Sequence, residues 1–173
     1  DDWLVILAGC SGKGRAMDFL GVNYYFREVI RATAKGAFWE KAIGTVDRDR
    51  DDVRRSEKND LGWLVYPEGL RHVVLKAHRA YKLPILITEN GICTRDEAQR
   101  SRFIRSHLAE LRLAIDEGAE VFGYLHWSLL DNFEWSIGYS PKFGLIAVDP
   151  ATLECTVKSS AQDYAQICRS NRL

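Results

Sequence analysis

Several features that mark common protein classes are absent from this sequence. Neither charge is in excess, since 24 Lys and Arg residues balance 24 Asp and Glu residues. This balance removes the global electrostatic case for binding nucleic acid or an anionic membrane. No apolar run approaches the length of about 18 residues that a membrane-spanning helix requires. The chain is 28% charged and 11% aromatic, so its composition is not that of a disordered protein.

Cysteine is scarce and follows no metal-binding pattern. The four cysteines stand at positions 10, 93, 155 and 168 without a Cys-x-x-Cys pair, and the four histidines form no His-Glu-x-x-His motif. We therefore expect no metal site and no cofactor. A chain of 173 residues can bury enough core to fold without disulfide bonds, which favours free thiols and a cytoplasmic location.

Two motifs near the start resemble functional signals but are incomplete. Residues 7–10 look like a lipoprotein cleavage site, yet the first two residues are acidic where basic ones are required, and the apolar run is too short. Residues 9–14 suggest a phosphate-binding loop, yet Leu7 and Gly14 occupy the places of an essential glycine and an essential Ser or Thr. A short buried element followed by a glycine-rich turn explains the segment without a ligand.

Strand and helix patterns alternate from position 17 onward. Nearly continuous apolar runs predict three strands buried on both faces, over residues 19–26, 83–88 and 121–127. The mixed charges of residues 47–60 predict a solvated loop, and residues 128–141 a second long loop. Amphipathic patterns predict helices that begin at Pro67, span about 96–116 and lie near 159–168. The expected apolar faces comprise Leu70, Val73, Val74, Ala77 and Tyr81 in the first helix and Ile104, Leu108, Leu111 and Ile115 in the second.

This order of elements predicts parallel βαβ units in one domain or one piece of a domain, with chemistry at the carboxyl ends of the strands. The sequence places Asn23, Tyr25, Glu89 and Trp127 at those ends, and a second acid, Glu134, in an aromatic loop. Aromatic faces and carboxylates suit the C–H faces and hydroxyl groups of a sugar, which indicates a carbohydrate site. The alternative is a purely structural aromatic core with two acids at its rim, which would contain the same residues.

Short blocks follow one another in a fixed order: LGVNYY at 20–25, YPEGL at 66–70, ITENG at 87–91, WSLLDNFEW at 127–135, GY at 138–139 and KFGL at 142–145. Together they resemble glycoside hydrolase family 1, which contains β-glucosidases and related retaining β-glycosidases. The resemblance implies an α/β fold, the C-terminal part of a (β/α)8 barrel with about its last three βα units. It implies one partial barrel domain over residues 1–173, in which 1–16 are atypical and 17–173 family-like.

The resemblance also implies a role for each candidate site residue. Glu89 would be the nucleophile of a retaining hydrolysis, and Tyr25 would orient it, with Asn23 as a supporting polar residue. The sugar would be bound by Trp127 beneath it, Glu134 and Trp135 at its distal hydroxyls, and Phe143 as an aromatic wall. Family members that act on 6-phosphoglycosides replace the acid at the position of Glu134. The implied substrate is therefore an unphosphorylated small-molecule β-glucoside, a closely related β-glycoside or a β-linked oligosaccharide.

One essential part of the family pattern is missing. No Asn-Glu-Pro block occurs in the sequence, so the acid/base glutamate is absent, although retaining hydrolysis needs two carboxyl groups about 5–5.5 Å apart. We expect the isolated chain to be inactive; the alternative is a carbohydrate-binding or interaction fragment without catalysis. Open sheet edges predict self-association or pairing with a complementary N-terminal barrel chain.

Overall fold

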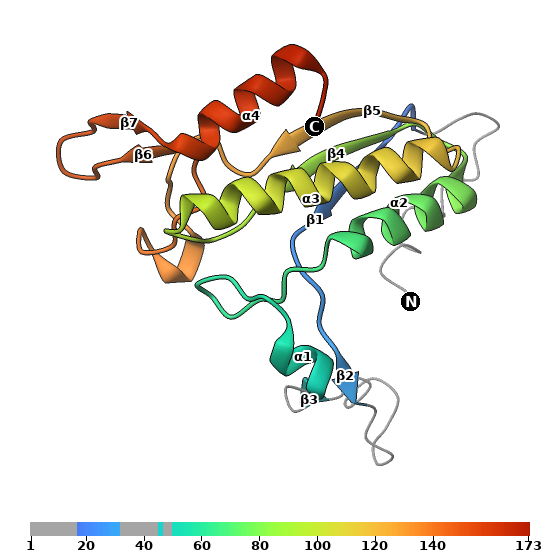
Figure 1. The fold of residues 1–173 in the computed structure, drawn as a ribbon, viewed down its shortest axis with the longest axis horizontal. Coiled ribbons are helices and arrows are strands. Elements are labelled where there is room, and N and C mark those ends of the chain that lie inside the picture. The colour runs from blue at the N-terminus through green and yellow to red at the C-terminus, as the bar shows by residue number, and fades with distance from the viewer. Residues whose placement is uncertain (1–16, 32–44, 47–49) are drawn as a thin grey trace.

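The computed structural model describes residues 17–31, 45–46 and 50–173 of the chain (Figure 1). Both incomplete motifs near the start, and the whole atypical segment 1–16, lie outside the described residues.

Three parallel strands form the central sheet. Their spatial order is β1, β4, β5, and both neighbouring pairs run parallel (Figure 1). The predicted parallel βαβ organisation is therefore confirmed. The strands are β1 (Leu20–Tyr24), β4 (Ile85–Asn90) and β5 (Val121–His126).

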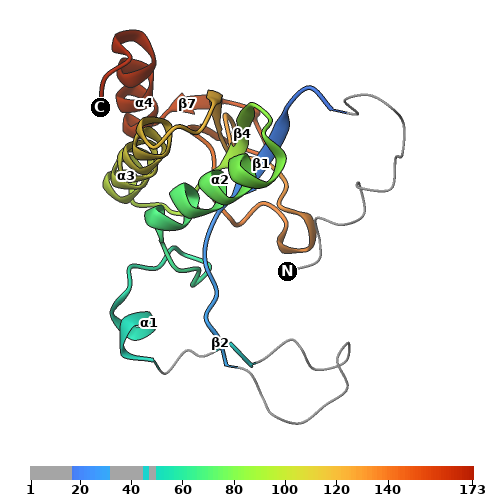
Figure 2. The ribbon, with the colours of Figure 1, turned by 90° about the vertical axis from the view of Figure 1, so that its right-hand side faces the viewer.

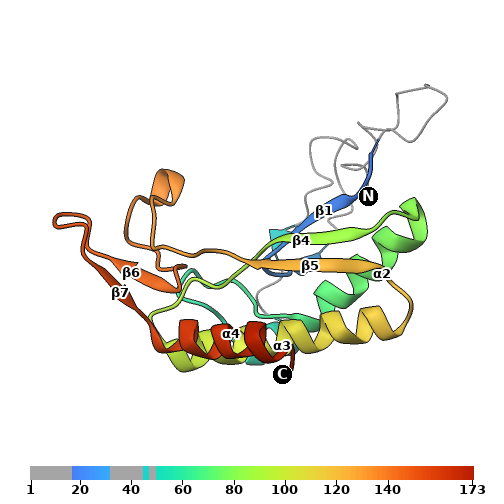
Figure 3. The same cartoon turned by 90° about the horizontal axis from the view of Figure 1, so that it is seen from above.

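Three helices lie on one face of this sheet (Figure 3): α2 (Pro67–Tyr81), α3 (Glu97–Asp116) and α4 (Ser159–Ser170). Pro67 is the first residue of α2, and the Asp96 side chain caps α3 by accepting two backbone N–H groups of its first turn. Gly118, with a φ of 97°, follows the end of α3, as predicted. No helix in the described part of the chain is long and apolar enough to cross a bilayer.

The smaller elements depart from the sequence-based expectation. The charged run predicted as a loop contains a short helix (Figure 2), because its acids occupy the first turn, its arginines the last turn, and Val53 is buried. The stretch after the long loop is one strand of a hairpin whose second strand was not predicted (Figure 1). These elements are α1 (Asp51–Arg55), a 3-10 helix (Trp135–Ile137), the antiparallel pair β2 (Ile30–Arg31) and β3 (Thr45–Val46), and the hairpin β6 (Ile146–Val148) and β7 (Cys155–Val157).

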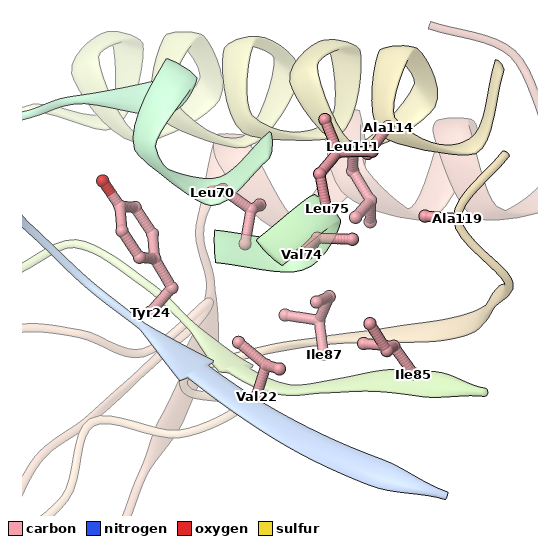
Figure 4. Packing of buried hydrophobic residues seen from close by; sticks show 10 residues of the cluster. All are labelled: Val22, Tyr24, Leu70, Val74, Leu75, Ile85, Ile87, Leu111, Ala114 and Ala119. Carbon is pink, nitrogen blue, oxygen red and sulfur yellow. The ribbon is translucent and has the colours of Figure 1, made fainter. Parts of the chain in front are cut away.

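The main core lies between the sheet and helices α2 and α3 (Figure 4). The predicted apolar faces are correct except at Val73 and Ile115, which are 41% and 40% exposed, and Leu75 is buried in their place. A core of this kind stabilises the layer through apolar area removed from water. The cluster comprises Val22, Tyr24, Leu70, Val74, Leu75, Ile85, Ile87, Leu111, Ala114 and Ala119.

No helix in the described part of the chain covers the opposite face of the sheet (Figure 3). Burial alternates along β1, so that Gly21 and Asn23 are exposed, and on β5 the side chains of Phe122 and Leu125 are 58% and 53% exposed. Phe19 packs edge-to-face against Phe122, with ring centroids 5.6 Å apart. The prediction of strands buried on both faces is wrong for β1 and β5, because α2, α3 and α4 all lie on the other side (Figure 3), whereas β4 has no exposed residue.

His107 on α3 is fully buried, and its protonation couples folding to pH. Its ring stacks on Phe103 with centroids 3.7 Å apart, and its Nδ1 lies 2.8 Å from the Phe103 carbonyl oxygen. Burial lowers the pKa of His107 from 6.5 to about 4. The folded state therefore holds a neutral imidazole at pH values where the unfolded chain already binds a proton.

We expect His107 to reduce the free energy of unfolding as the pH falls from about 6.5 to about 4, by at most about 1.4 kcal/mol per pH unit. Above the unfolded pKa both states are neutral, so the contribution is then constant. Urea titrations of the wild type and His107→Gln between about pH 7 and pH 5 measure it. The variant should lose stability less steeply on acidification; identical pH dependence in the two proteins would contradict the assignment.

Candidate active site

The carboxyl ends of β1 and β4 bring Tyr25 and Glu89 together. In the parallel ladder, Asn23 pairs with Glu89. The Tyr25 hydroxyl donates a hydrogen bond to Glu89 Oε2 at 2.6 Å. Glu89 belongs to β4, which continues to Asn90, so the strand ends later than predicted.

The ladder is irregular at this point. The register of β1 against β4 shifts between Val22 and Asn23, and that of β4 against β5 shifts between Ile87 and Asn90. Such irregularities are common beside active sites, where they redirect a side chain out of the regular alternation. Glu89 thus lies where the strand pairing is irregular, and its side chain contacts Tyr25.

Asn90 holds the three strand ends together beside Glu89. Its side chain is fully buried, donates to the Tyr24 carbonyl oxygen at 2.7 Å and accepts from the Tyr124 hydroxyl at 2.8 Å. Its carbonyl oxygen accepts from the Trp127 N–H at 3.0 Å. Sequence reasoning assigned no role to Asn90, although its place directly after Glu89 at a strand end was a signal for one.

Glu134 and Trp127 contribute to the same electrostatic environment. The pKa of Glu134 is raised mainly by burial and also by the negative charge of Glu89, while a side-chain hydrogen bond with Trp127 lowers it. Glu134 Oε1 is buried and has no hydrogen-bond partner among the described residues. A buried acceptor without a partner is costly unless a donor arrives, and a sugar hydroxyl is one such donor.

The Tyr25 hydroxyl stays protonated in this setting. Burial raises its pKa most, the hydrogen bond to Glu89 raises it further, and the charges of Glu89 and Glu134 act in the same direction. Tyr25 can therefore serve as a permanent hydrogen-bond donor to the Glu89 carboxylate.

Aromatic rings surround Tyr25. Phe143 lies edge-on to it at 6.2 Å between centroids, and so does Trp63, which also stacks on Phe26 at 4.4 Å. Phe143 is only 3% exposed, so it packs behind Tyr25. Sequence reasoning missed Trp63, whose position just before the block at 66–70 was the available signal.

Two predicted site residues lie at the edge of this cluster. Asn23 is exposed and accepts a hydrogen bond from the Thr88 hydroxyl at 2.6 Å. Trp135, in the 3-10 helix, is 83% exposed. Among the described residues no group of three or more His, Cys, Asp or Glu side chains is arranged to hold a metal ion.

Comparisons with known proteins agree on one family. The sequence model described as glycosyl hydrolase family 1 matches residues 13–173. The chain is 40% identical over 156 residues to a β-galactosidase from Sulfolobus acidocaldarius, across 90% of this chain and 32% of that protein. It matches the solved family 1 β-glucosidase from Thermotoga maritima with a TM-score of 0.82 and 32% identity, covering 91% of this chain and 36% of that one.

A β-glycosidase from Pyrococcus horikoshii matches with a TM-score of 0.76 and 37% identity, over 90% of this chain and 35% of its own length. The T. maritima enzyme has also been solved in complex with castanospermine. The chain spans about a third of the length of these relatives. Its three βα units are part of a (β/α)8 barrel, which confirms the predicted fold class.

Proposed function

The chain belongs to glycosyl hydrolase family 1, and on this basis we propose that it supplies the nucleophile of a retaining β-glycosidase. Its substrates would be unphosphorylated β-glucosides and closely related β-glycosides; the relatives are named β-galactosidases and β-glucosidases. The observation that carries the proposal is the 2.6 Å hydrogen bond from Tyr25 to Glu89 at the carboxyl ends of adjacent parallel strands.

In the proposed reaction Glu89 attacks the anomeric carbon while the bond to the leaving oxygen breaks and that oxygen takes a proton from a general acid. A covalent glycosyl ester on Glu89 results, and water then hydrolyses it with net retention. Since Tyr25 binds Oε2, we assign the attack to Glu89 Oε1. Tyr25 holds the carboxylate in one orientation throughout the reaction, so less conformational freedom is lost on reaching the transition state.

The general acid comes from outside these 173 residues in this proposal. Glu134 is a second carboxylate, whose own pKa is raised mainly by burial and also by the charge of Glu89, and whose charge helps to raise the pKa of Tyr25. We assign it to the sugar hydroxyls, because its buried Oε1 needs a donor. The two carboxylates also disfavour a phosphate group on the sugar, since like charges repel strongly where burial lowers the effective dielectric constant.

A single-chain chimaera tests the proposal. In it, residues 17–173 replace the matched segment of the T. maritima β-glucosidase, whose backbone superposes with a TM-score of 0.82. We expect the chimaera to hydrolyse 4-nitrophenyl β-glucoside with retention, to prefer it over the 6-phosphate, and the isolated chain to hydrolyse neither. A folded chimaera that binds castanospermine but hydrolyses nothing would favour the alternative, a carbohydrate-binding fragment without catalysis.

The exposed face of the sheet supports the proposal that part of the active barrel comes from outside this chain. Phe19 and Phe122 expose 47% and 58% of their surfaces on the side that carries no described helix. We infer that this face is covered by the rest of a barrel, supplied by a complementary N-terminal chain, or by a second copy when the chain is alone. Light scattering of the purified chain checks the second case, since a stable monomer at high concentration would contradict it.

Tyr25→Phe in the chimaera should lower kcat by about tenfold to a hundredfold, because a hydrogen bond to a charged group is worth about 1.5–3 kcal/mol. The phenyl ring keeps its packing against Phe143 and Trp63, so the fold should be unaffected. Steady-state kinetics measure the change, with Tyr81→Phe on the far end of α2 as the matched control. An unchanged kcat would show that the hydroxyl does not orient Glu89.

A further inference from the structure

Arg100, in α3, is a fully buried charge that the proposed reaction does not use. Its side chain has no solvent exposure. A guanidinium remains protonated in proteins, so burial is unfavourable unless every N–H finds an acceptor. The helix does not benefit from the charge either, because a cation near a helix N-terminus opposes the helix dipole. The reason for a buried arginine at this position must lie in its contacts.

The guanidinium binds two separate segments of the chain. Its Nη1 donates to the carbonyl oxygen of Ile92 at 2.8 Å and to that of Phe143 at 3.0 Å. Its Nη2 donates to the carbonyl oxygens of Thr94 and, at 3.2 Å, Lys142. Glu97, one turn earlier on α3, accepts from Nε and Nη2 at 3.3 Å and balances the charge.

Both segments bear directly on the candidate site. The first, residues 92–94, follows the end of β4, where Glu89 lies. The second carries Phe143, whose ring is edge-on to Tyr25, and its carbonyl oxygen also accepts from the N–H of Ser128 at 3.3 Å. Arg100 thus joins the segment that follows the Glu89 strand to the segment behind Tyr25, where Phe143 lies 43 residues after Arg100 in the sequence.

Only the planar, forked guanidinium group of arginine matches this arrangement of acceptors. Four carbonyl oxygens from two segments lie around one guanidinium, and an ammonium has three donors directed from a single point. A methionine fills a similar volume but donates nothing. Lysine and methionine variants therefore separate the roles of charge, volume and fork.

We propose that Arg100 is a positioning residue, which fixes Phe143 and the Tyr25–Glu89 pair in one register by binding the backbone behind both. We call Arg100 together with the carbonyl groups of residues 92, 94, 142 and 143 the clamp. The effect of the clamp on catalysis rests on the proposed function, whereas the clamp itself can be measured without any substrate.

Hydrogen exchange of the 173-residue chain, followed by mass spectrometry, tests the clamp. The amides of Thr94 and Ser128 donate to the same Lys142 and Phe143 carbonyl oxygens that Arg100 binds. In Arg100→Met we expect peptides that contain these amides to exchange about tenfold faster or more, with peptides from the rest of α3 unchanged. Arg112→Met, an exposed arginine on the same helix, is the matched control and should leave both regions unchanged.

The chimaera then reports the catalytic consequence. We expect Arg100→Met to lower kcat by about tenfold to a hundredfold with little change in KM, because misplacement affects the attack more than binding. Arg100→Lys should restore neither kcat nor the local exchange pattern. If the wild-type chimaera is itself inactive while the exchange result holds, the proposed function fails and the clamp stands.

Three results would overturn the clamp. They are unchanged local exchange in Arg100→Met, full restoration by Arg100→Lys, and uniformly fast exchange in both variants, which would indicate a role in stability alone.

Discussion

Glu89→Gln in the chimaera is expected to lower kcat for 4-nitrophenyl β-glucoside by about 10⁵-fold, as for other nucleophiles whose removal stops a covalent mechanism. An amide is not nucleophilic enough to form the glycosyl ester, yet its oxygen can still accept the hydrogen bond from Tyr25. Fold and sugar affinity should therefore persist while turnover is lost. Glu154→Gln, an exposed glutamate on the turn before β7, is the matched control and should be fully active.

The stereochemistry of the product tests whether Glu89 acts as the nucleophile or as the acid/base. When a nucleophile is removed, a small anion can attack the sugar once and invert its configuration; when an acid/base is removed, the glycosyl ester still forms and attack on it gives net retention. Glu89→Gly supplied with azide should therefore give the α-glycosyl azide. A β-glycosyl azide, or a kcat within about tenfold of wild type without azide, would contradict the assignment of Glu89 as nucleophile.

Gly91→Ala is expected to destabilise the chain by about 3 kcal/mol or more, since overpacking against backbone cannot relax by a rotamer change. A Cβ at position 91 would lie 1.8 Å from the Trp127 carbonyl oxygen and 2.8 Å from its carbonyl carbon. Relief of that clash would separate the ends of β4 and β5, where Asn90 and Trp127 share a hydrogen bond. Urea titration measures the loss of stability.

Gly21→Ala is the matched control for this change. It lies in the same sheet, and the atoms nearest to a Cβ there belong to the Thr88 side chain, the first of them Cγ2 at 3.2 Å. Its effect should be well under that of Gly91→Ala. Equal stability of Gly91→Ala and the wild type would show that the two strand ends are not held at this separation.

Much of the fold was predictable because its signals are local. Continuous apolar runs mark the three strands, and the spacing of apolar residues marks α2 and α3. The exposure of one face of the sheet was not predictable: Phe122 and Leu125 are apolar residues typical of a buried strand, but no described helix covers them. The helix α1 was not predicted, because a run of mixed charges is typical of a solvated loop. In the fold, Asp51 and Arg55 lie at the two ends of the helix and stabilise them.

The candidate site was partly predictable for a related reason. Strand-end polarity identifies Tyr25, Glu89 and Trp127, because parallel topology alone brings such residues to one edge. Arg100 depends on contacts with Phe143 that no local pattern encodes. One signal did exist: Arg100 stands four residues before Ile104, on the apolar face of α3, where an unneutralised charge is out of place.

Covalent trapping on the chimaera tests the assignment of the nucleophile most directly. The reagent 2,4-dinitrophenyl 2-deoxy-2-fluoro-β-glucoside has a leaving group that needs no acid, and its fluorine slows hydrolysis of the glycosyl ester. Peptide mass spectrometry should then find one fluoroglucosyl group on Glu89, and none on the Glu89→Gln variant. A label on Glu134 or any other residue, or turnover in the absence of any label, would contradict the placement of the nucleophile at Glu89.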